Sequence, residues 1–181
     1  MHHTGDPQTH AQLALILGAE CSGKTTLCEA LALKLAAPLA PEYLRVWCER
    51  EGRTPDRHEQ RQVMAGQLML TRAALSEAHT RRARWVLSDG APLLTAAYSI
   101  EYFNDHSLVD SGLRHAKRAA RIMLLDPDIA WQADGRLRDG PARRRSVHRI
   151  LVELLQQARI AHHTISGSPA QRIRDSLALL R

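Results

Sequence analysis

The residues best suited to carry out chemistry form one stretch that fits the pattern G-x-x-x-x-G-K-[ST], namely Gly18, Ala19, Glu20, Cys21, Ser22, Gly23, Lys24, Thr25 and Thr26. Glycines at two positions of this pattern let successive amide N–H groups turn toward one point, where they can bind phosphate oxygens. Lys24 is expected to reach the β- and γ-phosphates of ATP, and Thr25 to place its hydroxyl on Mg2+. Thr26 is expected near the α-phosphate. We therefore call residues 18–26 the P-loop.

The flanks of the P-loop predict a strand before it and a helix after it. Residues 13–17 are the apolar run Leu-Ala-Leu-Ile-Leu, which is typical of a strand buried on both faces. Residues 26–35 are good helix formers throughout. A helix that begins at such a loop adds its unpaired N–H groups and its dipole to the binding of the same anion. The context therefore agrees with the motif.

Length and composition predict a single α/β domain over residues 12–181, preceded by a flexible tail over residues 1–11. No apolar run is long enough to span a bilayer, and none of the three cysteines forms a C-x-x-C pair, so a reducing cytoplasmic location without membrane partners is expected. The net charge of +6 suits ligands that carry phosphate. The few aromatic residues do not alternate with basic ones, which argues against a nucleic acid partner.

Strands and helices are expected to alternate along the rest of the chain. Further strands are predicted at 38–43, 84–89, 121–126 and 160–165, and helices at about 56–82, 92–103, 108–119, 150–155 and 169–180. This alternation predicts three layers, with a mostly parallel five-stranded sheet and helices on both faces. Ligands of such sheets bind beyond the carboxyl ends of the strands. Residues that follow different strands are therefore expected to meet in one crevice.

Asp89 ends the strand predicted at 84–89 and is the main candidate for a catalytic carboxylate. It could hold the metal, or accept the proton of a substrate hydroxyl as a general base. The alternative is a structural role as the N-cap of the helix that begins near Pro92. Glu42 and Arg45 follow the predicted second strand and are expected to hold an acceptor in the same crevice.

A loop predicted at 132–145 is rich in arginine and could act as a lid. Phosphoryl transfer needs cations around the transferring group and exclusion of water, which a hinged loop with arginines would provide. The alternative is a solvated basic loop. Arg138 is the strongest candidate for a catalytic lid residue. The other lid candidates are Asp134, Gly135, Arg143, Arg144 and Arg145.

Aromatic side chains gather on the helix predicted at 92–103, where Tyr98, Tyr102 and Phe103 lie four and five residues apart. Such a group could form a wall against the flat ring of a substrate, or it could simply pack in the core. Both roles remain open from the sequence.

The order of these features resembles the ribosylnicotinamide kinase domain of bacterial NAD-biosynthesis regulators and the related small P-loop ATPases, over about residues 13–180. The P-loop is similar to that family's G-x-E-S-S-G-K-[ST] motif, and residues 42–45 resemble its E-Y-x-R motif. Asp89 with Thr95 resembles its strand-tip aspartate and following threonine. Trp131, Asp134, Gly135 and Arg138 resemble its W-x-x-D-G-x-R lid, with one extra residue.

This resemblance implies a nucleoside-kinase-like fold with an arginine-rich lid and a kinase that phosphorylates a riboside hydroxyl with MgATP. Glu42, Tyr43, Arg45 and Asp89 would then contact the acceptor, nicotinamide riboside among the candidates. The aromatic wall considered above would add Tyr98 and Tyr102. Pro41 and Ala91 stand where nicotinamide-binding members carry a tryptophan and a second acid. The rival interpretation is a nucleotide-dependent switch or partner-binding ATPase. The two differ in whether an acceptor pocket exists between Glu42, Asp89 and the aromatic helix.

Overall fold

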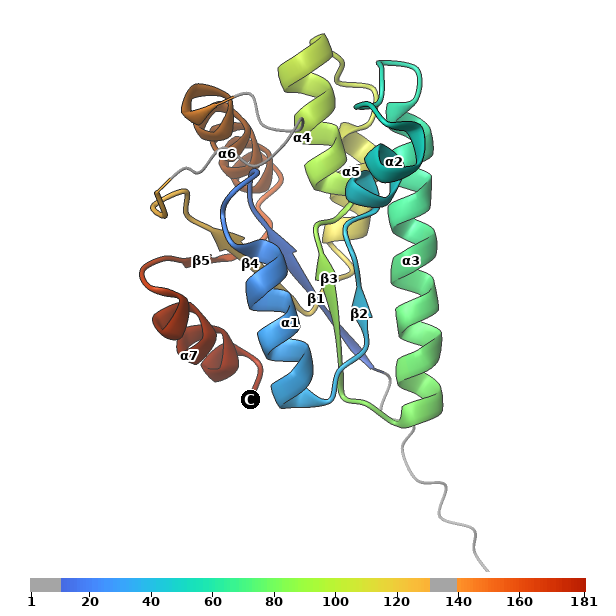
Figure 1. The fold of residues 1–181 in the computed structure, drawn as a ribbon. Helices are drawn as coiled ribbons and strands as arrows, with labels where there is room; N and C mark the ends of the chain where they lie inside the picture. Colours follow the sequence, from blue (N-terminus) through green and yellow to red (C-terminus); the bar gives the residue numbers. More distant parts are fainter. Residues whose placement is uncertain (1–10, 131–139) are drawn as a thin grey trace, which may run out of the picture.

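A five-stranded parallel sheet forms the centre of the described residues, in the order β2-β3-β1-β4-β5 (Figure 1). The computed structural model describes residues 11–130 and 140–181. The strands are β1 (Gln12–Leu17), β2 (Leu39–Ala40), β3 (Trp85–Asp89), β4 (Arg121–Leu125) and β5 (His163–Ile165). Because every neighbouring pair is parallel, all five carboxyl ends lie along one edge of the sheet, and the P-loop follows the middle strand there.

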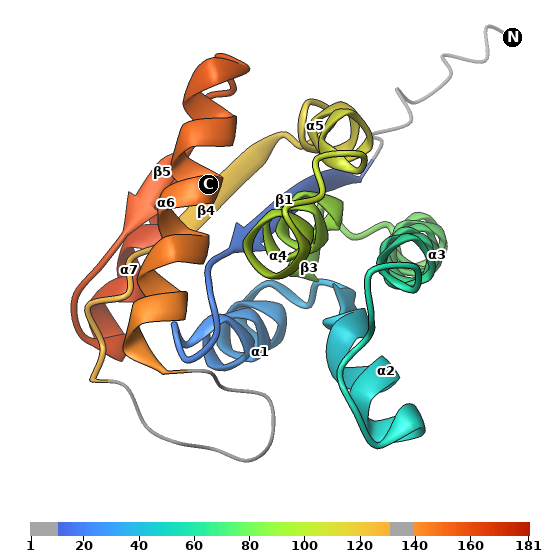
Figure 2. The same cartoon turned by 90° about the horizontal axis from the view of Figure 1, so that it is seen from above.

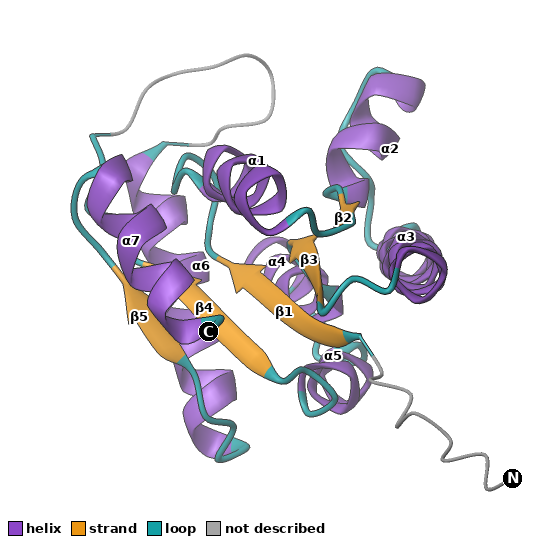
Figure 3. Cartoon of the chain, turned by 90° about the horizontal axis from the view of Figure 1, so that it is seen from below, coloured by secondary structure: helices purple, strands orange, loops and turns teal. Residues whose placement is uncertain are grey.

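Helices cover both faces of this sheet, as the views along the molecule show (Figures 2 and 3). They are α1 (Lys24–Leu35), α2 (Tyr43–Glu51), α3 (Gln60–Arg81), α4 (Pro92–Phe103), α5 (Val109–Ala116), α6 (Pro141–Gln157) and α7 (Pro169–Leu179). Residues of α1 and α7 share one core cluster with the sheet, and residues of α3, α4, α5 and α6 share the other. The predicted three-layer α/β architecture is confirmed.

The residues of β1 explain why both faces are covered. Leu13, Leu15 and Leu17 point into the larger core, whereas Ala14 and Ile16 point into the core under α1. Successive side chains of a strand face opposite sides, so a strand buried on both sides is apolar throughout. All five side chains are at most 7% exposed.

Three boundaries differ from those predicted. The second strand ends at Ala40, and the chain enters α2 at Tyr43, a helix that the sequence analysis did not predict. Pro41 cannot donate to a strand ladder, and Glu42 takes an extended conformation as the N-cap of α2. The fifth strand is shorter than predicted and begins at His163. The predicted loop at 132–145 ends earlier, because Gly140 has a φ of 91° and Pro141 starts α6.

Candidate active site

The P-loop forms a tight turn between β1 and α1 that requires glycine at two positions, Gly18 and Gly23. Gly23 is the N-cap of α1 and has a left-handed φ of 79°, a conformation that side chains disfavour. A Cβ atom at Gly18 would lie 2.6 Å from the Oγ atom of Ser22. The Ser22 hydroxyl and the Lys24 ammonium both donate to the carbonyl oxygen of Ala19, at 2.8 and 3.2 Å. This is the cradle that a polyphosphate would fill.

Asp89 lies against the P-loop because β3 pairs with β1 in a register that aligns Asp89 with Ile16. The Thr25 hydroxyl donates to Asp89 Oδ2 at 2.6 Å. The other oxygen, Oδ1, is buried and has no hydrogen-bond partner among the described residues. Asp89 does not cap α4, whose N-cap is Ala91 without a side-chain hydrogen bond. The structural alternative for Asp89 is therefore wrong.

The pair formed by Thr25 and Asp89 fits a magnesium ion. Mg2+ prefers oxygen ligands and usually takes few of them from the protein, with the rest from phosphates and water. A hydroxyl oxygen and a carboxylate with one buried, unpaired oxygen offer such ligands side by side. Within the described residues, no group of three or more His, Cys, Asp or Glu side chains could hold a metal. Thr25 and Asp89 are thus the residues that would hold Mg2+, together with a bound nucleotide.

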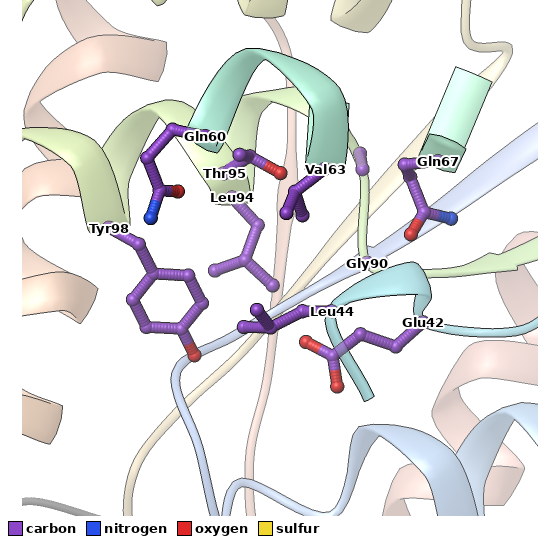
Figure 4. Close-up of a pocket in the computed structure, with 10 residues that line it drawn as sticks. Glu42, Leu44, Gln60, Val63, Gln67, Gly90, Leu94, Thr95 and Tyr98 are labelled. Carbon is purple, nitrogen blue, oxygen red and sulfur yellow. The ribbon is translucent and has the colours of Figure 1, made fainter. Parts of the chain in front are cut away.

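A narrow pocket of about 10 Å³, the space of about one water molecule, lies directly beyond Asp89, between α2, α3 and the start of α4 (Figure 4). A larger ligand would fit there only if these elements moved apart. Its base is apolar, and the polar ends of Glu42 and Tyr98 lie on either side of Leu44. Burial raises the pKa of the Tyr98 hydroxyl well above its usual value, and the charges of Glu42 and Glu20 raise it further. The hydroxyl therefore keeps its proton and can donate a hydrogen bond. The lining residues are Glu42, Leu44, Gln60, Val63, Gln67, Gly90, Ala91, Leu94, Thr95 and Tyr98.

The predicted acceptor residues divide into those that line this pocket and those that do not. Glu42 and Tyr98 line it. The ring of Tyr43 instead packs on α3, where a Cβ atom at Gly66 would lie 2.2 Å from it. Arg45 is exposed on α2. Tyr102 is 37% exposed, and the Arg143 guanidinium carbon lies 5.1 Å from its ring centroid.

Gln67 is a residue of this pocket that the sequence analysis missed. Its Oε1 atom accepts from the Tyr43 amide at 2.8 Å, and its Nε2 atom donates to the Pro41 carbonyl at 3.2 Å and to Ser88 Oγ at 3.4 Å. One buried amide therefore joins α3 to the start of α2 and to the residue before Asp89. The sequence feature that could have revealed the role of Gln67 is a polar residue on the buried face of a long helix.

The predicted lid lies only partly within the described residues. Trp131, Asp134, Gly135 and Arg138 lie outside them. Arg143, Arg144 and Arg145 belong to the first turns of α6 and not to a loop, which corrects the prediction for these three.

The three arginines of α6 that were predicted to belong to the lid have different surroundings. Arg143 forms an ion pair with Glu101 at 3.0 Å. Arg144 is buried and donates to the carbonyl oxygen of Ile129 at 2.7 Å, and the Ile129 side chain lies beside Gly23 of the P-loop. Arg145 is exposed. Arg144 thus supports the segment beside the P-loop from within the fold.

Arg172 of α7 also supports the P-loop, although 150 residues separate it from Ser22 in the sequence. It is 2% exposed, and it donates to the carbonyl oxygens of Ser22 at 2.7 Å, Gly167 at 2.9 Å and Asp126 at 2.9 Å. It also pairs with Asp128. By holding the Ser22 carbonyl on the outside of the turn, Arg172 favours the conformation in which the loop amides point inward. We therefore describe it as a positioning residue.

Replacement of Arg172 by Met is expected to lower both stability and nucleotide affinity. The substitution leaves three carbonyl oxygens without their donor, and each such loss from a buried site costs about 1–3 kcal/mol of the free energy of unfolding. Asp128 is 36% exposed, so the loss of its ion pair contributes little. The folded variant is expected to bind ATP more weakly as well, because the Ser22 carbonyl loses its donor. Titration calorimetry with ATP, at a temperature where denaturant curves show the variant folded, measures this second effect. Arg174→Met, at an exposed position of the same helix, is the control and is expected to keep wild-type ATP affinity. If folded Arg172→Met also bound ATP as tightly as the wild type, Arg172 would have a purely structural role.

Solved structures with the same fold as this chain include a NadR protein in complex with NR, with a TM-score of 0.77 and 18% identity. The match covers 96% of this chain but 51% of that one, so this chain spans about half the length of the NadR chain. The thymidylate kinase of Candida albicans matches with a TM-score of 0.68 and 16% identity, over 94% of this chain and 91% of that one. The thymidylate kinase of Ehrlichia chaffeensis matches at 0.66 and 15%, over 94% and 99%.

These likenesses concern the fold, which is that of the P-loop nucleoside kinases, with the strand order described above. No helix among the described residues is long and apolar enough to cross a membrane. No curated protein sequence matches the chain significantly. The model of one AAA domain family matches residues 13–172, from the first strand through the P-loop and Asp89 to Arg172. Since this match spans most of the sequence, the chain belongs to that family of P-loop AAA domains.

Proposed function

We propose that the protein is a kinase that transfers the γ-phosphoryl group of MgATP to a hydroxyl group of a small, nucleoside-like acceptor. The observation that carries this proposal is the position of the pocket. Gly90 and Ala91 form part of its wall, and they directly follow Asp89, whose carboxylate accepts from Thr25 of the P-loop. A switch that only bound and hydrolysed ATP would have no need for a pocket at this place.

Each residue has a separate task in the proposed reaction. The P-loop amides and Lys24 bind the phosphates, and bound Mg2+ supplies charge neutralisation between them. Asp89 accepts or orients the proton of the acceptor hydroxyl, since its Oδ1 atom has no hydrogen-bond partner among the described residues and the next residue, Gly90, lines the pocket. Glu42 and Tyr98 offer a hydrogen-bond acceptor and a donor to the bound molecule. Arg138 remains our candidate for the cation that stabilises the transferring group.

The charge of the pocket narrows the class of acceptor. Among its lining residues Glu42 is the one that carries a full charge. A carboxylate without a neighbouring cation in the lining disfavours a nucleoside monophosphate and favours a neutral or positively charged nucleoside. Nicotinamide riboside, whose ring carries a positive charge, belongs to this class and agrees with the family resemblance. Neutral nucleosides fit the same description.

A panel of acceptors tests this proposal. ADP release from MgATP is measured with nicotinamide riboside, with the common ribo- and deoxyribonucleosides, and with their 5′-monophosphates. We expect at least one unphosphorylated compound to accelerate ADP release, and mass spectrometry to find its phosphorylated product. Slow release that no compound accelerates would instead support a nucleotide switch. Acceleration by monophosphates alone would contradict the proposed acceptor class.

Replacement of Gln67 by Leu tests the pocket separately from the nucleotide site. The change keeps a similar volume but removes the hydrogen bonds that fix the start of α2, and thereby Glu42. We expect the KM for the acceptor to rise about tenfold, which corresponds to one such bond lost from a buried site, while ATP affinity stays the same. Steady-state kinetics with both substrates varied measure the two effects. Gln62→Leu, at an exposed position of the same helix, is the control. If Gln67→Leu weakened ATP binding as much as it raised the KM for the acceptor, the assignment of Gln67 to the acceptor pocket would be contradicted.

A further inference from the structure

A second hollow lies at the opposite edge of the sheet, where β1 begins, and is lined by residues of α3 and α5 among others. Figure 3 shows these two helices near the start of β1. The strands start there, whereas the P-loop and the acceptor pocket lie where they end. The hollow has a volume of about 470 Å³. Small-molecule sites commonly have volumes of about 300–1,000 Å³, so the hollow is large enough for a ligand. The proposed kinase reaction makes no use of it.

Its lining combines an apolar base with positive charge. Leu68 and Leu75 of α3 line it, together with Arg72 and Arg118, whose side chains are exposed. No lining residue carries a carboxylate. Neither arginine forms an ion pair with any described residue. The hollow therefore carries positive charge that the described part of the fold leaves uncompensated.

His115 of α5 adds an unpaired polar atom to the same hollow. Its Nδ1 atom is buried and has no hydrogen-bond partner among the described residues. Burial lowers the pKa of His115 to about 4, and the positive charges of Arg118 and Arg72 contribute to the shift. The imidazole is thus neutral at physiological pH, and both guanidinium groups lie close enough to act on it. Buried polar atoms in folded proteins nearly always have partners, so the unpaired Nδ1 atom is an unusual feature of a wall that also carries two arginines without ion pairs.

We propose that this hollow binds a small molecule that carries a phosphate or carboxylate group on an apolar body. The anionic group would lie between Arg72 and Arg118 and accept hydrogen bonds from them. Guanidinium groups suit both anions, because their planar donors match two oxygens at once. The apolar part would cover Leu68 and Leu75, which the hollow leaves accessible. This second site is independent of the kinase assignment.

Nuclear magnetic resonance with three matched probes tests the proposal on the whole protein. Phenyl phosphate and benzoate carry the two anions on a phenyl ring, and benzyl alcohol carries a neutral group on the same ring. We expect an anionic probe to shift the backbone amides of Gln12, Ala119 and Ala120, which line the hollow. Benzyl alcohol is expected to bind there at least about tenfold more weakly, since it lacks the charged hydrogen bonds. The tighter of the two anionic probes identifies the anion.

Two variants and a control locate the site. Arg72→Gln and Arg118→Gln are each expected to weaken the anionic probe about tenfold. Arg114→Gln, on the same helix as His115 but hydrogen-bonded to Ser111 outside the hollow, is expected to leave the affinity unchanged. Shifts confined to P-loop amides such as Gly23, equal binding of benzyl alcohol, or no shift with millimolar probe would each overturn the proposal. A chain without kinase activity would still be expected to bind the probe.

Discussion

Lys24→Ala is expected to abolish turnover of MgATP and to weaken its binding at least about tenfold, the smallest effect expected for losing a charged hydrogen bond to phosphate. Lys24 is 6% exposed, and its ammonium group donates to the Ala19 carbonyl in the P-loop. It forms no ion pair with any described residue. Its removal therefore leaves no unpaired carboxylate behind, and the fold is expected to stay intact. Titration calorimetry with ATP and coupled detection of ADP measure the two losses.

Lys34→Ala provides the matched control for this variant. Lys34 lies in the last turn of the same helix and is exposed, so its removal changes the net charge equally without touching the P-loop. We expect wild-type binding and turnover from it. Wild-type turnover by Lys24→Ala would disprove the assignment of the P-loop as the phosphate site, and with it the proposed kinase.

The features that could be predicted from the sequence are those that depend on neighbouring residues. The P-loop is a continuous pattern between an apolar strand and a helix. Asp89 stands at the tip of a strand, and the rule that ligands bind at the carboxyl ends of parallel strands is enough to place it near the P-loop. The alternation of strands and helices likewise predicts the layers without knowledge of any distant contact.

The features that the sequence did not reveal depend on residues far apart in the chain. Gln67 gains its role only because α2 begins against α3 and β3 ends beside them. Arg172 gains its role only because α7 returns to the P-loop from the end of the chain. In its local sequence, each of these two residues is simply one polar residue in an amphipathic helix. The helix α2 itself was missed because Pro41 and the short strand before it favour an extended interpretation, while Gly52, its left-handed C-cap, is a signal that could have revealed it.

Arg144 is a residue that the local sequence suggests is exposed but that the structure buries. An arginine in a run of basic residues after a glycine and a proline suggests a solvated loop, and the prediction placed it in a lid. The structure buries it in α6, where it holds the Ile129 carbonyl. Local composition cannot separate a buried arginine from its exposed neighbours Arg143 and Arg145. Only the helical period, which places Arg144, Val147 and Leu151 on one buried face, distinguishes them.

Asp89→Asn is expected to lower the rate of phosphoryl transfer about a hundred- to ten-thousand-fold, the usual contribution of a general base. The amide cannot accept the proton of the acceptor hydroxyl, and it is a poorer ligand for Mg2+ than a carboxylate. Affinity for ATP is expected to change much less, because the P-loop amides and Lys24 remain. Single-turnover kinetics at saturating ATP and acceptor measure the chemical step separately from binding.

The same substitution is expected to leave the protein as stable as the wild type, or more stable. Asp89 is 3% exposed, and its Oδ1 atom lacks a partner among the described residues. A buried carboxylate in that state destabilises the fold, while an amide of equal size loses the charge and can still accept from Thr25 at 2.6 Å. A loss of activity together with an unchanged or higher Tm would therefore identify a residue kept for chemistry at the expense of stability. Asp126→Asn is the control, since it changes a carboxylate at the same edge of the sheet outside the pocket. Asp126 follows β4, on the other side of β1 from β3, and faces His148. An unaltered single-turnover rate for Asp89→Asn would show that Asp89 neither accepts the proton nor holds the metal, and the pocket beside it would then need another catalytic group.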